Sequence, residues 1–360
     1  MKKVHIRSVK PGDKIAKTIL SEAGQVLLAA GLELSQRYID RLKALGIDTV
    51  YIEDEHTDDI VPEDVLSDTT RKKAVETVYK MMTGLMDQPK VTGRIAMPDM
   101  GKVFRNVFGN ILGDLSGRKD IMVNLVNLHS LGGYLFHHSV NVAVLAGIIG
   151  LAKGYNREQL MDLGVGALLF DIGMIMLPKD LWNKKTMLTE EERAYIENHT
   201  EDGFNILRYQ YDMSLLSAHC ALQHHERYNG SGYPRKLEKD QIHEYAQIVG
   251  IADVYDALTS HRSHRQHYTP NEALEYLFAS GNTLFDLELV KLFVKHIAAY
   301  PIASTVVLNT GQIGVVSHVH PNAVHRPIVR IVQERDGTVV KAPYEIDLKT
   351  HTNIVITRTL

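Results

Sequence analysis

The chain has 360 residues, of which 44% are hydrophobic and 23% are charged, and its formal net charge is −3. This length allows two or three domains, and this composition excludes a largely disordered chain. The small negative charge excludes the basic character expected of a protein that binds a nucleic-acid polymer.

The N-terminal residues MKKVHIRSVKPGD lack the apolar core of a signal peptide. The single cysteine, Cys220, excludes a disulfide within the chain and fits a reducing compartment. The longest apolar run, near residues 142–152, is shorter than the roughly 20 residues that a spanning helix needs. We therefore expect a soluble cytoplasmic protein without membrane insertion.

Residues 1–55 are predicted to form a small N-terminal α/β module. KTILSEAGQVLLAAG predicts a hairpin that turns at Gly24. SQRYIDRLKALG predicts a helix with Ser35 as its N-cap and Gly46 just after its end, and DTVYIED predicts a closing strand. This pattern fits a packing or dimerisation module and leaves a sensory role open.

The remaining chain is predicted to fall into three parts. Residues 56–122 begin with an acidic linker and continue as connecting helices, and residues 123–300 show helical periodicity. Residues 301–360 contain short β-branched runs with turns at Thr310–Gly311 and Asp336–Gly337, which predict an all-β module of three to five strands. The predicted fold class is therefore mainly α, a helical bundle with small modules at both ends.

Six residues of the helical region could share one metal site: His138, Asp171, His199, His224, His225 and Asp253. Imidazole and carboxylate groups suit divalent ions such as iron, manganese or zinc, and helical bundles often build such sites from inward-pointing side chains. Spacing alone does not decide the matter, because a single histidine is more often a polar residue with protein partners than a ligand.

The order of the motifs is more specific. HHERYNGSGYP, residues 224–234, joins two histidines and a glutamate to a Gly-X-Gly-Tyr-Pro turn, and HSVNVAVLAG precedes it while IADVYDALTSHRSHR follows it. This region resembles the HD-GYP family, the branch of the His-Asp superfamily that degrades the bacterial messenger cyclic di-GMP. The resemblance covers about 125–300 and implies a helical HD-type bundle around two or three metal ions.

The resemblance also implies roles for individual residues. It assigns the metal ligands to His138, Asp171, His199, His224, His225 and Asp253. Asp171 and Tyr233 would be the catalytic residues, with Asp171 bridging two ions and Tyr233 near the substrate. Arg262 and Arg265 would hold the substrate phosphates, since guanidinium groups match phosphate oxygens.

Three positions depart from the family pattern. Phe170 stands in place of the histidine of the His-Asp doublet, Met174 in place of a lysine, and Tyr134 in place of a carboxylate found in some members. One ion would still be held well, by Asp171, His199, His224 and His225. A neighbouring ion would keep only His138, Asp171, Asp253 and water. We expect two divalent ions or one, iron or manganese.

Two classes of function remain open. In the first, the protein is a phosphodiesterase that hydrolyses cyclic di-GMP to linear pGpG or to GMP. In the second, it is a weak or inactive receptor for cyclic di-GMP or metal, which the residues Phe170 and Met174 favour. A purely structural role and a nucleoside triphosphate hydrolase are further alternatives, although the latter gives no reason for the Gly-Tyr-Pro turn. The sequence leaves open whether the chain forms a homodimer.

Overall fold

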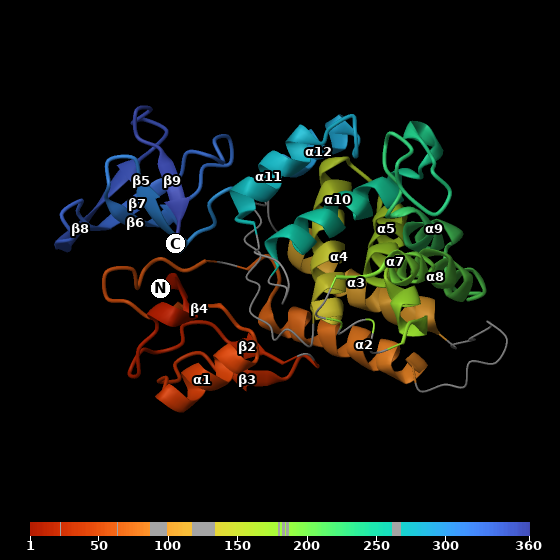
Figure 1. Ribbon diagram of the computed structural model, residues 1–360, viewed down its shortest axis with the longest axis horizontal. Helices are drawn as coiled ribbons and strands as arrows, with labels where there is room; N and C mark the ends of the chain where they lie inside the picture. The colour runs from red at the N-terminus through yellow and green to blue at the C-terminus, as the bar shows by residue number, and fades with distance from the viewer. Residues whose placement is uncertain are drawn as a thin grey trace.

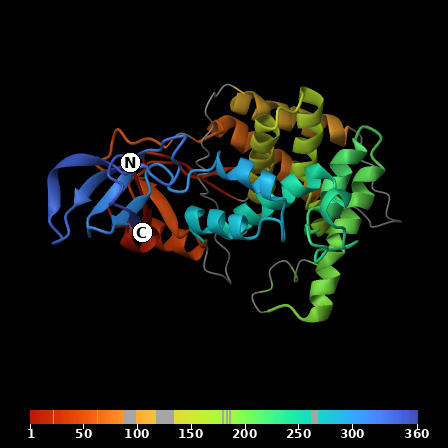
Figure 2. The same cartoon turned by 90° about the horizontal axis from the view of Figure 1, so that it is seen from above.

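The computed structural model describes the whole chain except Glu22, Glu63 and residues 87–98, 117–133, 179–180, 182–183, 185–186 and 261–267. A helical bundle occupies one side of the molecule, and a lobe that contains both termini occupies the other (Figures 1 and 2). This arrangement confirms the predicted fold class, a helical bundle with a small module at each end.

The bundle is built around one long apolar helix, α4. Its sequence is apolar on nearly every face, so the helix has to be covered on all sides, and residues Phe136–Gly150 are buried. The described helices of the bundle are α2 (Asp68–Met86), α3 (Met100–Ser116), α4 (Tyr134–Ala152), α5 (Arg157–Leu169), η3 (Ile172–Met176), α7 (Glu190–Glu197), α8 (His199–Arg208), α9 (Leu215–Gln223), η4 (Lys239–Gln241), α10 (Glu244–Thr259), α11 (Pro270–Ala279) and α12 (Leu287–Val294).

Two segments, Tyr134–Ala152 and Arg157–Met176, are long and apolar enough to cross a membrane. The apolar stretch of the first segment is 83% buried inside the protein, and that of the second segment is 72% buried. Core helices of a folded domain share this property, so the two segments are weak evidence for a membrane span. Their apolar surface is already covered by neighbouring helices.

The N-terminal module contains β1 (Lys2–His5), η1 (Ile6–Ser8), β2 (Ile19–Leu20), β3 (Val26–Leu28), α1 (Gln36–Ala44) and β4 (Thr49–Ile52). The predicted hairpin, helix and closing strand are confirmed: β2 pairs with β3, and the Ser35 side chain accepts a hydrogen bond from Tyr38 N at the start of α1. Gly24 and Gly46 have positive φ angles of 76° and 72°, which glycine adopts readily. Strand β1, which pairs with β4, was not predicted.

The C-terminal module is one antiparallel sheet of five strands in the order β8-β7-β6-β5-β9. The number of strands lies within the predicted range, and glycines with positive φ, Gly311 and Gly337, stand in the two predicted turns. The strands are β5 (Thr305–Leu308), β6 (Ile313–His318), β7 (Ile328–Gln333), β8 (Val339–Asp347) and β9 (Ile356–Thr359).

The two terminal modules pack against each other. Lys3 N donates to Ala303 O at 2.8 Å, and Thr305 Oγ1 donates to Lys3 O at 3.0 Å. Ala303 and Val315 belong to the hydrophobic core of the N-terminal module. Lys3 and Thr305, which are 302 positions apart in the sequence, thus meet in one lobe (Figure 1). The boundaries after residues 55, 122 and 300 stay predictions.

The N-terminal hairpin also contacts the bundle. His137 Nε2 on α4 lies 3.0 Å from Ser21 O. A Cβ atom on Gly24 would lie 3.2 Å from Lys72 O of α2, so the turn approaches this helix closely. The hairpin therefore reaches the bundle one residue away from His138.

Candidate metal centre

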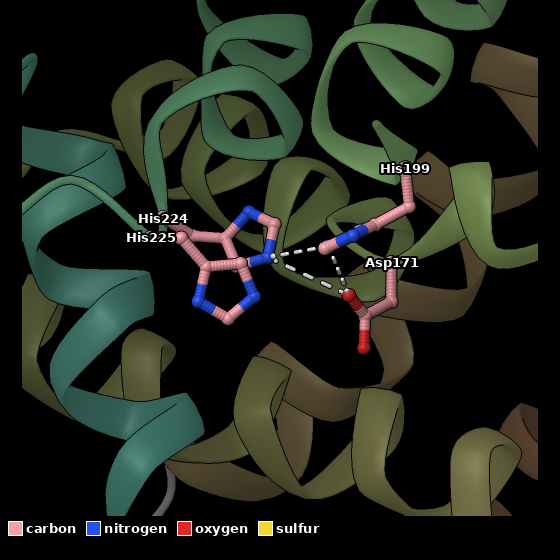
Figure 3. Close-up of side chains that lie close together, drawn as sticks. All are labelled: Asp171, His199, His224 and His225. Carbon is pink, nitrogen blue, oxygen red and sulfur yellow. Dashed lines mark hydrogen bonds and ion pairs between the residues drawn. The ribbon is translucent and has the colours of Figure 1, made fainter. Parts of the chain in front are cut away.

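Four side chains converge between η3, α8 and the end of α9. The candidate ligand atoms of Asp171, His199, His224 and His225 all lie within 4.8 Å of one another. Asp171 Oδ1 lies 3.4 Å from His199 Nε2 and 3.5 Å from His224 Nε2, and the two nitrogens are 3.3 Å apart (Figure 3). Two ligands bound at about 2.1 Å to one ion are separated by ~3.0–3.4 Å, so this spacing fits a single metal ion.

The imidazole rings are oriented by backbone carbonyl groups. His199 Nδ1 lies 2.6 Å from Ile196 O, and His224 Nδ1 lies 3.0 Å from both Cys220 O and Ala221 O. Each carbonyl can accept the Nδ1–H, which directs Nε2 of the same ring toward Asp171. Metal-ligating histidines are held in this way, so the four residues fit a divalent transition metal.

Close backbone approach brings Asp171 and His199 together. Asp171 directly precedes η3, and a Cβ atom on Gly173 would lie 1.9 Å from His199 O. Only glycine fits this contact between η3 and the start of α8.

The end of α9 explains how two adjacent histidines reach one centre. Adjacent residues within a helix point about 100° apart. Helix α9 ends at Gln223, His224 is its C-cap, and His225 lies beyond it. The two imidazole rings can therefore lie close together, with centroids 4.1 Å apart.

The Gly-Tyr-Pro turn packs on His225. The Tyr233 ring stacks on the His225 ring with centroids 4.7 Å apart, and Tyr233 N donates to His225 O at 3.2 Å. A Cβ atom on Gly232 would lie 2.4 Å from that carbonyl oxygen, which requires glycine. The Glu226 carboxylate accepts hydrogen bonds from two backbone N–H groups after the turn, at 2.8 and 2.9 Å. The glutamate of the motif thus holds the turn in place.

The electrostatics of the centre also suit a cation. Burial raises the pKa of Asp171, but the adjacent rings of His199 and His224 outweigh burial and hold this pKa well below its usual value. Burial lowers the pKa of His225 well below 6.5, so this ring is neutral. Burial raises the pKa of Tyr233, so its phenol keeps the proton. An ionised carboxylate and a neutral imidazole are the forms that bind metals.

The other two predicted ligands belong to a second polar group, the His138 network. His138 Nε2 lies 2.9 Å from Asp253 Oδ1, and His138 Nδ1 lies 2.7 Å from Asp256 Oδ2. Asn141 Nδ2 donates to Asp256 Oδ1 at 3.0 Å, and an Arg71 guanidinium nitrogen donates to Asn141 Oδ1 at 2.9 Å. All five side chains are buried. The structure therefore places His138 and Asp253 in contact with each other, outside the four-residue centre.

Charge in the His138 network is balanced internally. Burial lowers the pKa of His138, but hydrogen bonds to Asp253 and Asp256 outweigh burial and raise this pKa to about 9. Burial raises the pKa of Asp253, but the hydrogen bond from His138 outweighs it and lowers this pKa to about 2. The network thus contains an imidazolium between carboxylates.

Phe170 contacts both groups. It is fully buried at the end of α5, and its ring centroid is 5.6 Å from that of His138 and 4.9 Å from that of His224. Tyr134, another departure from the family pattern, stacks on His138 at 4.7 Å, while Met174 is half-buried on η3. Two of the three departing residues therefore pack against His138.

Sequence reasoning missed Asp256, Asn141 and Arg71. Asp256 follows Asp253 by three residues and Asn141 follows His138 by three residues, each in an otherwise apolar helix. This spacing puts both members of a pair on one helix face and could have predicted a buried polar contact. Arg71 stands among lysines, and no signal marks it as buried.

Comparison with known proteins identifies the part of the bundle that holds the candidate site. Residues 120–289 match the family model described as HD domain, and residues 305–360 match the model of a KOW domain associated with HD domain. Residues 120–289 are an HD domain. The resemblance inferred from the motifs is confirmed. The HD domain contains every predicted site residue, although Arg262 and Arg265 lie outside the described residues.

Three relatives are cyclic dinucleotide phosphodiesterases by name. A cyclic di-GMP phosphodiesterase of Pseudomonas aeruginosa is 34% identical over 212 residues, which cover 58% of this chain and 50% of that protein. The cyclic di-GMP phosphodiesterase response regulator RpfG of Xanthomonas campestris is 36% identical over 152 residues, 42% of this chain and 40% of that protein. A 3'3'-cGAMP-specific phosphodiesterase of Vibrio cholerae is 31% identical over 209 residues, 56% and 39% of the respective chains. The chain spans half or less of the length of each relative.

Proposed function

We propose that this chain is a metal-dependent phosphodiesterase that hydrolyses cyclic di-GMP to linear pGpG or to GMP. The observation that carries the proposal is the convergence of Asp171 Oδ1 with the Nε2 atoms of His199 and His224. The names of the relatives support a cyclic dinucleotide as the substrate class.

The proposal gives each predicted site residue a role. The metal, iron or manganese, would be held by Asp171, His199, His224 and His225. When bound, a divalent ion supplies positive charge beside the phosphodiester and lowers the pKa of a water molecule. Tyr233 keeps its proton and can donate a hydrogen bond to a phosphate oxygen. Arg262 and Arg265, in the segment outside the described residues, are the proposed phosphate contacts.

The test is turnover of cyclic di-GMP by protein loaded with Mn(II) or Fe(II), followed by chromatography of the products. We expect linear pGpG or GMP from the wild type and none from His224→Ala. His219→Ala is the matched control, because His219 is half-buried on the same helix and lies outside the four-residue centre. Equal turnover by wild type and His224→Ala would refute the proposed site.

The substrate is tested separately from the reaction. We expect kcat/KM to be higher for cyclic di-GMP than for 3'3'-cGAMP, because two of the three relatives described act on cyclic di-GMP by name. The opposite preference would change the proposed substrate and leave the proposed reaction in place.

A receptor is the second candidate function. The buried phenylalanine at position 170 and the methionine at position 174 favour it, because neither side chain can bind a metal as imidazole does or attract phosphate as lysine does. Binding of cyclic di-GMP in a calorimeter, without product after prolonged incubation with either metal, would support the receptor.

A further inference from the structure

We infer that each chain binds one metal ion. A second ion would have to be held by His138 and Asp253, but these two residues are engaged in the His138 network, and the Phe170 ring packs beside them. The inference deepens the proposed function, since it concerns the same site. It rests on three features: the hydrogen bonds of His138, the position of the Phe170 ring and the completeness of the four-residue centre.

The first feature is that both ring nitrogens of His138 already have protein partners. Both ring nitrogens face carboxylate oxygens, at 2.9 Å from Asp253 and 2.7 Å from Asp256. An ion at His138 would therefore have to replace one of these two contacts and leave a buried carboxylate without its imidazole partner. Asn141 donates to Asp256 and Arg71 donates to Asn141, so further buried side chains depend on the same network.

The second feature is the Phe170 ring. Its edge-on contacts with His138 and His224 place a phenyl group against both the network and the four-residue centre. The ring is fully buried and supplies no ligand atom. An ion held jointly by Asp171 and His138 would have to displace it from a close-packed core.

The third feature is that the four-residue centre is sufficient by itself. One carboxylate and three imidazoles provide four ligands, which is enough to hold a divalent transition metal and leaves coordination positions for water or substrate. The Asp171 side chain is 14% exposed, whereas the His199 and His224 side chains are buried, so solvent reaches the centre at the carboxylate.

The test counts ions without measuring activity. Wild-type protein is loaded with Mn(II), desalted and measured by plasma mass spectrometry, and we expect one Mn per chain. Electron paramagnetic resonance should show the six-line hyperfine pattern of an isolated Mn(II). Two Mn per chain, or the spectrum of an exchange-coupled pair, would overturn the inference.

Matched variants separate the two groups. His138→Gln should keep one Mn with a Kd within threefold of wild type, whereas His224→Ala should lose more than nine-tenths of its Mn. If His138→Gln does not fold, Asp253→Asn tests the same network from α10 with the same expectation. Loss of Mn from a folded His138→Gln or Asp253→Asn protein would also overturn the inference.

The outcomes distinguish this inference from the proposed function. Two ions together with turnover of cyclic di-GMP would refute the single-ion site and support the phosphodiesterase. One ion without turnover of either cyclic dinucleotide would support the single-ion site and refute the phosphodiesterase.

Discussion

The four-residue centre and the His138 network both contact Phe170 and use the same kinds of side chain for different purposes. In the centre, Nδ1 of His199 and of His224 faces a backbone carbonyl, so the Nε2 atoms converge on Asp171. In the network, both nitrogens of His138 face carboxylates, so donors and acceptors alternate. The comparison teaches that the partner of the second ring nitrogen decides whether a buried histidine is available to a metal.

Removing a carboxylate from the network should have the largest effect on stability. In Asp256→Ala, His138 loses a buried partner, and breaking a buried ion pair in this way costs ~3–5 kcal/mol. The free energy of unfolding in urea, measured without added metal, checks this expectation. Asp240→Ala, an exposed carboxylate, is the control and should stay within ~0.5 kcal/mol of wild type. A loss in Asp256→Ala no larger than in the control would mean that the network adds nothing to stability.

The neighbouring histidine sharpens the comparison, because His137 lies on the same helix as His138 and its pKa is shifted in the opposite direction. Burial lowers the pKa of His137 from 6.5 to about 4. The unfolded chain therefore binds the proton first, so this contribution to stability is present above pH 6.5 and is lost as the pH falls to 4. The loss amounts to about 3 kcal/mol.

Unfolding free energies of wild type and His137→Gln between pH 7.5 and pH 4 check this window. Glutamine retains a donor for Ser21 O but does not titrate. The wild type should lose more stability than the variant over this range. Parallel curves for the two proteins would show that His137 does not titrate as expected.

Neutralising one carboxylate in each group compares the groups directly. Asp171→Asn should weaken Mn(II) binding by more than about a hundredfold, because changes outside the ligand sphere alone reach that range. Asp253→Asn makes the same chemical change in the His138 network and should alter Mn(II) affinity less than threefold. Calorimetric titration of both variants measures the difference. Similar losses in both would place Asp253 among the ligands.

Phe170→His should add an imidazole ligand next to both groups. We expect this substitution to have the smallest effect on the free energy of unfolding. Without metal, replacing a buried phenyl ring with imidazole should lower stability by a fraction of ~3 kcal/mol. With Mn(II) or Fe(II), the new imidazole should add about one ion per chain, offset that loss and raise the phosphodiesterase rate. Adding Met174→Lys should raise the rate further by restoring a cation near the phosphate. Unchanged metal content and rate would mean that an imidazole at position 170 does not complete a second metal site.

Local signals in the sequence were enough for much of the fold and part of the site. The turn at Gly24, the cap at Ser35 and the glycine turns of the C-terminal sheet depend on residues a few positions apart. The Gly-Tyr-Pro turn is local in the same sense, because Gly232 lets the chain fold back onto His225. The set Asp171, His199, His224 and His225 was predicted to hold one ion and does lie together.

Only the tertiary structure decided that His138 belongs to the hydrogen-bonded network and not to the four-residue centre. Its partners Asp253 and Asp256 are 115 and 118 residues away in the chain, and the contact exists because α4 and α10 pack side by side in the bundle. The same holds for the lobe that the two termini form, where Lys3 meets Ala303 and Thr305. Residue type and order identify groups that are able to bind a metal, whereas the packing of distant elements determines whether each group meets a carbonyl, a carboxylate or an ion.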